Sequence, residues 1–396
     1  AMSYDIIPET AITDLDWNKV ETPCYVVDTR LLARNAELLA TIPQRVPKAR
    51  VLLALKGFAM WSTFDVLRPY LSGCCASGAI EAQLAREEFG KEVHTYAPAF
   101  TDAEMQQVLQ LSDHVVFNSP SQLRKHLPAV RAFEQASGRK IDVALRVNPG
   151  YSEVDTELYN PCALGSRLGC LRTPDVDALI DELDGLHFHV MCQQGSDTLA
   201  RVIEHLEQGY GDILDRVKYL NCGGGHHITR PGYDTDLLVD TLNGVLQRHP
   251  NLEHIYLEPG EAIGLNTGVL VTSVMDLIEN GMPIAILDTS CTAHMPDVLE
   301  MPYRPTIHGA GDPGQLPYTY RLGGMTCLAG DVMGDWSFRE PLKPGDRIVF
   351  ADMAHYTMVK TTMFNGVKHP SIATWDGETL NVHRRFGYED FRNRLS

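Results

Sequence analysis

Four short segments place reactive or conformationally special residues at the end of apolar runs. Lys56 follows Val-Leu-Leu-Ala-Leu, and His189 lies near the end of a strand-like run at 185–190. Gly223-Gly224-Gly225 and Glu258-Pro259-Gly260 stand at the ends of two further strand-like runs. A lysine that ends an apolar run loses hydration, which lowers the pKa of its amine and frees it for attack on an aldehyde. The alternative is a lysine at the rim of the fold that pairs with a carboxylate.

The remaining segments fit pyridoxal phosphate, an aldehyde cofactor that would be held by Lys56 as a Schiff base. Gly223, Gly224 and Gly225 could bring backbone N–H groups close to a phosphate, although most glycine runs are simply turns. Glu258 could pair with a protonated pyridine nitrogen and keep the ring an electron sink, or it could form a buried salt bridge. His189 could stack on the ring, or be an ordinary core histidine.

Adjacent histidines at 226 and 227 suggest a metal site. Neighbouring side chains point apart on most backbones, however, and no Cys or carboxylate stands at ligand spacing. We therefore expect no metal, and a metal-dependent barrel enzyme is the third alternative.

Composition excludes several classes of protein. A net charge of -17 argues against binding of nucleic acid, which needs basic patches, and is compatible with a cationic substrate. No apolar stretch is long enough to span a bilayer, so no membrane partner is expected. The N-terminus lacks a signal pattern, and the nine Cys are irregularly spaced, which predicts reduced thiols and a cytoplasmic location.

The chain alternates short apolar runs with segments of helical periodicity from about residue 51 to residue 257. Strands are expected at 51–55, 73–76, 93–97, 114–117, 142–147, 185–190, 219–222 and 254–257. Helices are expected at 79–89, 103–111, 122–136, 173–183, 198–210 and 234–248. This order predicts the α/β class and a (β/α)8 TIM barrel, in which functional side chains gather at the carboxyl ends of the strands.

From about residue 269 the pattern changes to strands with Gly/Pro turns, at 269–278, 284–288, 347–350, 373–375 and 380–382. We therefore expect a barrel domain over 29–267 and a mostly β C-terminal domain over 268–396. The strand-like run at 22–27 suggests that the N-terminal segment, 1–28, joins the β domain.

These landmarks resemble the fold type III pyridoxal-phosphate family, which includes alanine racemase and the ornithine and diaminopimelate decarboxylases. The resemblance covers nearly the whole chain. It includes Leu55-Lys56, the glycine triplet, Glu258-Pro259-Gly260, and the residues 146–149, 326–331 and 364–366. Segments 187–192, 223–230, 258–262 and 294–305 are similar to the carboxynorspermidine (carboxyspermidine) decarboxylases of that family.

The resemblance implies an alanine-racemase-type barrel and a homodimer whose active sites are completed across the interface. Cys327 resembles the cysteine that reaches the neighbouring subunit's site, where it would donate a proton to the α-carbon. Tyr356 matches the tyrosine that usually touches the phosphate. His189 would pack on the ring while Glu258 stabilises the carbanion left by loss of CO2.

Three departures separate the chain from the ornithine and diaminopimelate enzymes. Glu261 stands where those enzymes usually have Arg, Cys192 where they have Ser, and Leu328 where they have an acidic residue. A carboxylated polyamine carries ammonium groups that favour acidic contacts. Glu261 and Asp297 are therefore expected to hold the cationic substrate, with Arg304 also in the substrate site and Glu300 a weaker candidate.

The expected function is pyridoxal-phosphate-dependent decarboxylation of carboxynorspermidine or carboxyspermidine to norspermidine or spermidine. A diaminopimelate, ornithine or arginine decarboxylase is the alternative enzyme. The alternative of another class is a pyridoxal-phosphate-binding regulator without catalysis, against which Lys56 and Cys327 both argue.

Overall fold

The computed structural model describes residues 7–396 and divides the chain into two compact units. The barrel unit comprises residues 35–56 and 63–263. The β unit comprises, among the described residues, 7–34, 57–62 and 264–396. Residues 1–6 of the predicted N-terminal segment lie outside the described residues.

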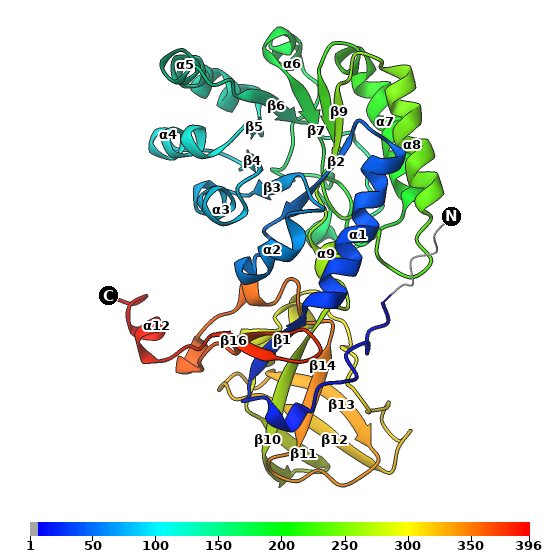
Figure 1. Ribbon diagram of the computed structural model, residues 1–396, viewed down its shortest axis with the longest axis vertical. Helices are drawn as coiled ribbons and strands as arrows, with labels where there is room; N and C mark the ends of the chain where they lie inside the picture. Colours follow the sequence, from blue (N-terminus) through cyan, green and yellow to red (C-terminus); the bar gives the residue numbers. More distant parts are fainter. Residues whose placement is uncertain (1–6) are drawn as a thin grey trace. The chain divides into compact units, whose positions relative to one another are not determined.

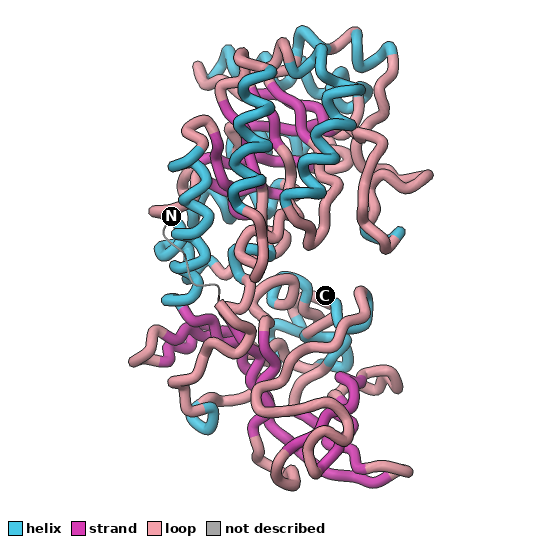
Figure 2. The backbone as a smooth tube through the Cα atoms, turned by 90° about the vertical axis from the view of Figure 1, so that its right-hand side faces the viewer, coloured by secondary structure: helices cyan, strands magenta, loops and turns pink. Residues whose placement is uncertain are grey.

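The barrel unit contains eight parallel strands that close on themselves (Figures 1 and 2). They are β2 (Ala49–Ala54), β3 (Gly73–Ala76), β4 (Glu92–Tyr96), β5 (His114–Phe117), β6 (Asp142–Arg146), β7 (Gly185–His187), β8 (Tyr219–Asn221) and β9 (His254–Leu257). Pairing of Val51 with Leu257 joins the first strand to the last. The predicted (β/α)8 barrel is confirmed.

One helix precedes β2, and a helix follows each of the eight strands (Figure 1). They are α1 (Thr29–Arg45), α2 (Phe64–Leu67), α3 (Ala79–Leu84), α4 (Asp102–Leu111), α5 (Pro120–Ser137), α6 (Pro174–Asp177), α7 (Ser196–Leu214), α8 (Thr235–Arg248) and α9 (Glu261–Gly264). Local chemistry sets their ends: Thr101 and Glu104 form a capping box on α4, and Gly138 ends α5 in the left-handed conformation. Among residues 7–396, no helix has the length and apolar content needed to cross a bilayer.

Two predicted helices differ from the structure. The helix expected at 173–183 is only α6 followed by a 3-10 turn, η5 (Ile180–Glu182), because Leu179 leaves helical geometry at φ -109 and ψ 1. The helix expected at 79–89 begins as α3 and continues as a π-helical turn, η3 (Ala85–Phe89). Apolar periodicity alone cannot distinguish these variants from a regular helix.

The β unit is an eight-stranded mixed sheet. Its strands are β1 (Cys24–Asp28), β10 (Gly268–Glu279), β11 (Pro283–Leu287), β12 (Tyr318–Gly323), β13 (Val332–Phe338), β14 (Arg347–Ala351), β15 (Ser371–Trp375) and β16 (Leu380–Arg384). β1 pairs with both β10 and β15, so strands from the two ends of the chain share one sheet. The predicted mostly β second domain is confirmed.

Both faces of the central β strands are buried. Tyr25 and Leu270 pack in one apolar cluster, whereas Val26 and Val269 pack in another. Burial on both faces explains why these strands read as continuous apolar runs. The sequence prediction omits β12 and β13. Both strands contain polar residues and a glycine, Gly323 or Gly334, and neither forms a continuous apolar run.

Short helical segments complete the described chain. The β unit has α10 (Cys291–His294), α11 (Asp297–Glu300), α12 (Tyr388–Arg392), η1 (Trp17–Lys19), η6 (Met358–Lys360) and η7 (Phe364–Gly366). The barrel unit has η4 (Glu157–Tyr159), and η2 (Trp61–Thr63) ends at the boundary between the two units.

Candidate active site

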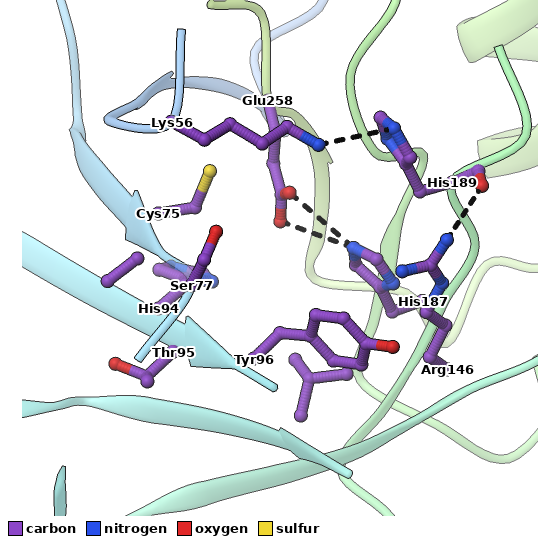
Figure 3. A pocket seen from close by; sticks show the side chains of 12 residues that line it. Lys56, Cys75, Ser77, His94, Thr95, Tyr96, Arg146, His187, His189 and Glu258 are labelled. Atoms are coloured by element: carbon purple, nitrogen blue, oxygen red, sulfur yellow. Dashed lines mark hydrogen bonds and ion pairs between the residues drawn. The ribbon is translucent and has the colours of Figure 1, made fainter. Parts of the chain in front are cut away.

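Three predicted residues line one pocket of the barrel unit. Lys56, His189 and Glu258 stand one or two residues beyond β2, β7 and β9. They meet because the carboxyl ends of parallel barrel strands lie at the same rim. Figure 3 shows Lys56, His189 and Glu258 converging. The other lining residues are Cys75, Ala76, Ser77, His94, Thr95, Tyr96, Val116, Arg146 and His187.

The Lys56 amine lies 3.4 Å from Nε2 of His189. Solvent reaches Lys56 through the pocket, yet the surrounding groups displace most of its hydration, and this lowers the pKa of the amine. Arg146 adds to the decrease, while Cys75 and Glu258 oppose it. The neutral, nucleophilic amine is therefore more populated than in an exposed lysine.

Glu258 is an ionised carboxylate held by two neighbours. The Asn221 amide donates to Oε1, and Nε2 of His187 lies 3.4 Å from Oε1 and 3.5 Å from Oε2. Burial by itself raises the pKa of Glu258, but His187, His94 and Asn221 outweigh it and bring the pKa to about 2. The carboxylate thus keeps its charge at neutral pH.

His189 presents a neutral ring whose edges are both engaged. Its Nδ1 accepts the Gly224 N–H at 2.8 Å, while Nε2 faces Lys56. Burial holds the pKa of His189 well below its usual value, and the charges of Lys56 and Arg146 lower it further. Arg146 also donates to the His189 carbonyl at 3.0 Å. The ring plane is thereby fixed.

The glycine triplet is required by close backbone packing. A Cβ at Gly223 would lie 2.4 Å from the Phe188 carbonyl oxygen, and one at Gly225 would lie 2.1 Å from that of Met191. Both glycines also have positive φ, 65° and 82°. The N–H groups of Gly223 and Gly224 donate to Asn221 and His189. Two of the three N–H groups expected at a phosphate are thus already used inside the protein.

Glu261 belongs to the barrel unit, whereas the remaining predicted site residues belong to the β unit. Cys327 is exposed, with its N–H donated to Asn365, and Tyr356 has a left-handed backbone at φ 48. Asp297 accepts from Lys360 at 2.5 Å. Arg304 lies 3.5 Å from the ring centre of Trp336 and also bonds Asp312 and the Asp335 carbonyl. Their places in the active site stay predictions.

Sequence reasoning missed two neighbours of the site carboxylate. His187 shares a face with His189 by strand alternation, but nothing in the sequence indicates that it contacts Glu258. Asn221 ends β8, two residues before the glycine turn. Its position beside a predicted functional carboxylate becomes visible only when β8 and β9 pair.

A second polar cluster lies within the same barrel. We call Glu92, His94 and His114 the inner set, and His187, His189 and Glu258 the pocket set. Each inner-set residue offers one ligand atom within 4.8 Å of the others. However, the two inner imidazoles stack at 3.9 Å with 8° between their planes, so their lone pairs run parallel and cannot converge on one ion.

The pair at 226–227 also fails as a metal site by its geometry. Nε2 of His226 donates to the carbonyl oxygens of Cys222 and Gly223. Nε2 of His227 lies 3.6 Å from Glu261. One of the two rings is thus directed at backbone oxygens and the other at a carboxylate.

Lys56 and the pocket set together fit pyridoxal phosphate. A primary amine of lowered pKa, an ionised carboxylate and a flat neutral imidazole line the same cavity. These are the groups that would bind the aldehyde carbon, the pyridinium N–H and a ring face.

Comparisons with known proteins agree with this chemistry. A family model described as "Pyridoxal-dependent decarboxylase, C-terminal sheet domain" matches residues 24–354. The chain is 44% identical to carboxyaminopropylagmatine decarboxylase of Synechocystis sp., over 96% of each chain. It is 41% identical to carboxynorspermidine/carboxyspermidine decarboxylase of Campylobacter jejuni, over 96% of this chain and 99% of that protein.

A solved structure extends the likeness to three dimensions. Carboxynorspermidine decarboxylase of Campylobacter jejuni, complexed with norspermidine, superposes with a TM-score of 0.86 at 40% identity. The alignment covers 95% of this chain and all of that one, 100%. Together with the pocket, these matches show that the chain belongs to the pyridoxal-dependent decarboxylases.

Proposed function

We propose that the enzyme decarboxylates a carboxylated polyamine, carboxynorspermidine or carboxyspermidine, and so forms norspermidine or spermidine. The Campylobacter relative at 41% identity and a Herminiimonas arsenicoxydans relative at 37% bear the name of this activity. The observation in this chain that carries the proposal is an acidic residue, Glu261, three residues beyond Glu258 at the same barrel rim.

Glu261 is oriented by a neutral donor. Nε2 of Gln193 donates to Oε1 of Glu261 at 2.8 Å, and Nε2 of His227 lies 3.6 Å from the same oxygen. Gln193 itself has a left-handed backbone, φ 52, of the kind that folds retain at functional sites. A neutral amide fixes the direction of a carboxylate without cancelling its charge, which suits contact with an ammonium group.

Pyridoxal phosphate, when bound, accepts the electrons released as the bond to the substrate carboxylate breaks. The chain supplies the groups around it. Lys56 offers its uncharged Nζ to the aldehyde carbon and Glu258 accepts the pyridine N–H. His189 covers a ring face, with Tyr356 on the phosphate. Glu261 and Asp297 bind the cationic tail and Arg304 adds to the substrate site. For Asp297, the substrate must compete with Lys360.

The proton that replaces CO2 at the α-carbon comes, in this proposal, from Cys327 of a second subunit. The Cys327 thiol is exposed, and Met325 and Leu328 beside it expose 45% and 46% of their surfaces. Asp331 orders this segment through hydrogen bonds to Thr326 and to the Cys291 N–H. An ordered, apolar loop that displays a thiol is suited to an isologous dimer interface.

Mixed dimers test this arrangement. Lys56→Ala and Cys327→Ala variants are each expected to be nearly inactive alone. Mixed and re-equilibrated, they should recover about a quarter of wild-type activity, because half of the dimers then contain one intact site. Absence of recovery in a mixture shown to exchange subunits would refute the shared site.

The Synechocystis relative supports a second candidate substrate, carboxyaminopropylagmatine, at 44% identity. This substrate ends in a planar guanidinium in place of an ammonium, and a carboxylate can bind a guanidinium through two parallel bonds. CO2 release from carboxynorspermidine, carboxyspermidine, carboxyaminopropylagmatine, diaminopimelate, ornithine and arginine decides among them. Preference for any of the last three would overturn the proposal, and release from none would favour a regulator.

Glu261→Arg tests the role of the rim carboxylate. It should lower kcat/KM for the polyamine by about ten- to a hundredfold, the worth of a charged hydrogen bond, with cofactor affinity nearly unchanged. Gln193→Leu should have a smaller effect in the same direction. Gln83→Leu is the matched control, because Gln83 donates to Glu87 at 2.9 Å on the barrel surface. Equal loss of cofactor and substrate binding would remove the proposed role.

We also place the enzyme in the cytoplasm. All nine cysteines are free thiols, which suits a reducing compartment. Fractionation of the producing cells, with activity in the soluble fraction, is the expected result.

A further inference from the structure

Asn221 joins two parts of the pocket that the sequence treats separately. Its side chain is fully buried at the carboxyl end of β8. Nδ2 donates to Oε1 of Glu258, and Oδ1 accepts the N–H of Gly223 at 2.9 Å. One amide therefore contacts both the carboxylate for the pyridine nitrogen and the first residue of the glycine turn.

The hydrogen bonds to Glu258 and Gly223 use both ends of the Asn221 amide. A carboxamide has a donor end and an acceptor end, and here the carboxylate takes the donor while the backbone N–H takes the acceptor. An apolar side chain of similar size would leave both partners unsatisfied in a buried setting. An aspartate would set a second negative charge beside Glu258.

The connection continues around the pocket. Beyond Gly223, the N–H of Gly224 donates to Nδ1 of His189, and the opposite edge of that ring faces the Lys56 amine. Hydrogen-bonded groups thus run from Glu258 through Asn221 and the glycine turn to His189 and Lys56. A displacement at either end of this series is transmitted to the other through buried polar bonds.

We propose that Asn221 is a positioning residue that couples the ring-nitrogen end of the cofactor site to its phosphate end. This inference rests on the expectation from the sequence that the cofactor phosphate lies at the glycine turn, and it does not depend on which substrate the enzyme uses. Asn221 aims the carboxylate at the pyridine N–H and, through Gly223, fixes the turn at the phosphate.

Titration of the cofactor-free full chain with three probes tests the coupling without any substrate. The probes are pyridoxal phosphate, its 1-deaza analogue, which lacks the ring nitrogen, and pyridoxal, which lacks the phosphate. The wild-type ratio of affinities for the first two reports the ring-nitrogen contact. The ratio for pyridoxal phosphate over pyridoxal reports the phosphate contact.

Asn221→Leu should lower both ratios by about tenfold, as expected for loss of a hydrogen bond to a charged group. Asn251→Leu is the control, because Asn251 donates to the carbonyls of Leu214 and Val217 and does not line the pocket, and it should leave both ratios unchanged. If Asn221→Leu does not fold by circular dichroism, Asn221→Ser takes its place.

Two outcomes would overturn the inference. Equal weakening of all three probes would leave both ratios at the wild-type value and would mean a purely structural role. A fall in only one ratio would mean that Asn221 serves one end of the site and does not couple the two. Failure of the substrate proposal would appear in CO2 release and would not alter either ratio.

Discussion

The barrel holds two sets of histidine and carboxylate side chains with opposite character. In the pocket set, Glu258 has a pKa of about 2 and faces a cavity that also contains Lys56. In the inner set, Glu92 accepts contacts from His94 and His114 at 3.4 and 3.3 Å and from the Tyr256 hydroxyl at 3.1 Å. Only His94 belongs to the inner set and also lines the pocket.

The difference shows that residue types alone do not define a reactive site. In the pocket set, Asn221 donates to Glu258 and Gly224 donates to His189, so each of these two side chains has its own partner and both line the cavity. The inner rings instead stack on each other, and their Nε2 atoms lie 3.4 and 3.3 Å from Glu92. We infer that the pocket set serves catalysis and that the inner set stabilises the fold.

Removal of the reactive amine should give the largest effect. Lys56→Ala is expected to reduce activity by at least about a thousandfold, because a nucleophile has no substitute among its neighbours. The near-visible absorbance of the bound cofactor should disappear as well. Lys125→Ala, on the surface of α5, is the control for loss of a lysine. A coloured, active Lys56→Ala protein would remove the basis of the comparison.

Matched amide substitutions in the two carboxylates separate their roles. Glu258→Gln should lower kcat on the order of a hundredfold, as for loss of a charge aimed at the transition state. Glu92→Gln should leave kcat near the wild-type value and lower the free energy of unfolding by about 1–3 kcal/mol, the cost of a poorly satisfied buried network.

Steady-state kinetics and chemical denaturation of both variants measure these effects. A Glu92→Gln enzyme that loses kcat as severely as Glu258→Gln would make the inner set part of the catalytic apparatus.

Sequence patterns predicted the barrel and the β domain because strand and helix periodicities are local properties. The ends of β2, β7 and β9 could be combined into one site because barrel topology forces them together. Asn221 and the inner set could not be predicted, since their contacts depend on register between strands. His94 and His114, for example, are brought together only by the pairing of β4 with β5.

The limits of the α6 and β12–β13 predictions have a similar cause. The early end of α6 at Asp177 depends on the backbone conformation of Leu179, and polar strands are stabilised by the sheet that they join. The role of the glycine triplet also could not be predicted from the sequence. Its contact with the neighbouring backbone is a packing constraint that a run of three glycines cannot specify.

The pH dependence of stability should separate the two sets further. Burial first, and then His114, lower the pKa of His94 from 6.5 to about 4. Below pH 6.5, His94 becomes protonated in the unfolded chain but stays neutral in the folded protein. The free energy of unfolding should therefore fall as the pH falls toward about 4. The lowered pKa of Glu92 acts in the same direction at more acidic pH.

His94→Gln should remove up to about 3 kcal/mol of this acid-dependent loss, since each pKa unit corresponds to about 1.4 kcal/mol. Denaturation curves across the same pH interval measure it. His205→Gln, which changes a partly exposed histidine on α7, should retain the full dependence. An unchanged slope in His94→Gln would mean that the inner set does not govern acid stability.

The smallest effect should come from the outer contact of the inner set. Asp142 lies 3.6 Å from Nε2 of His114, and its side chain is 29% exposed. Burial first, and then Asp184, raise the pKa of Asp142, while His114 and Lys140 oppose the shift. A raised carboxyl pKa means that the fold disfavours the ionised form, so Asp142→Asn should increase the free energy of unfolding by less than about 1 kcal/mol. A loss of several kcal/mol, measured by denaturation at neutral pH, would show that the network depends on Asp142 as much as on Glu92, and would extend the inner set from three residues to four.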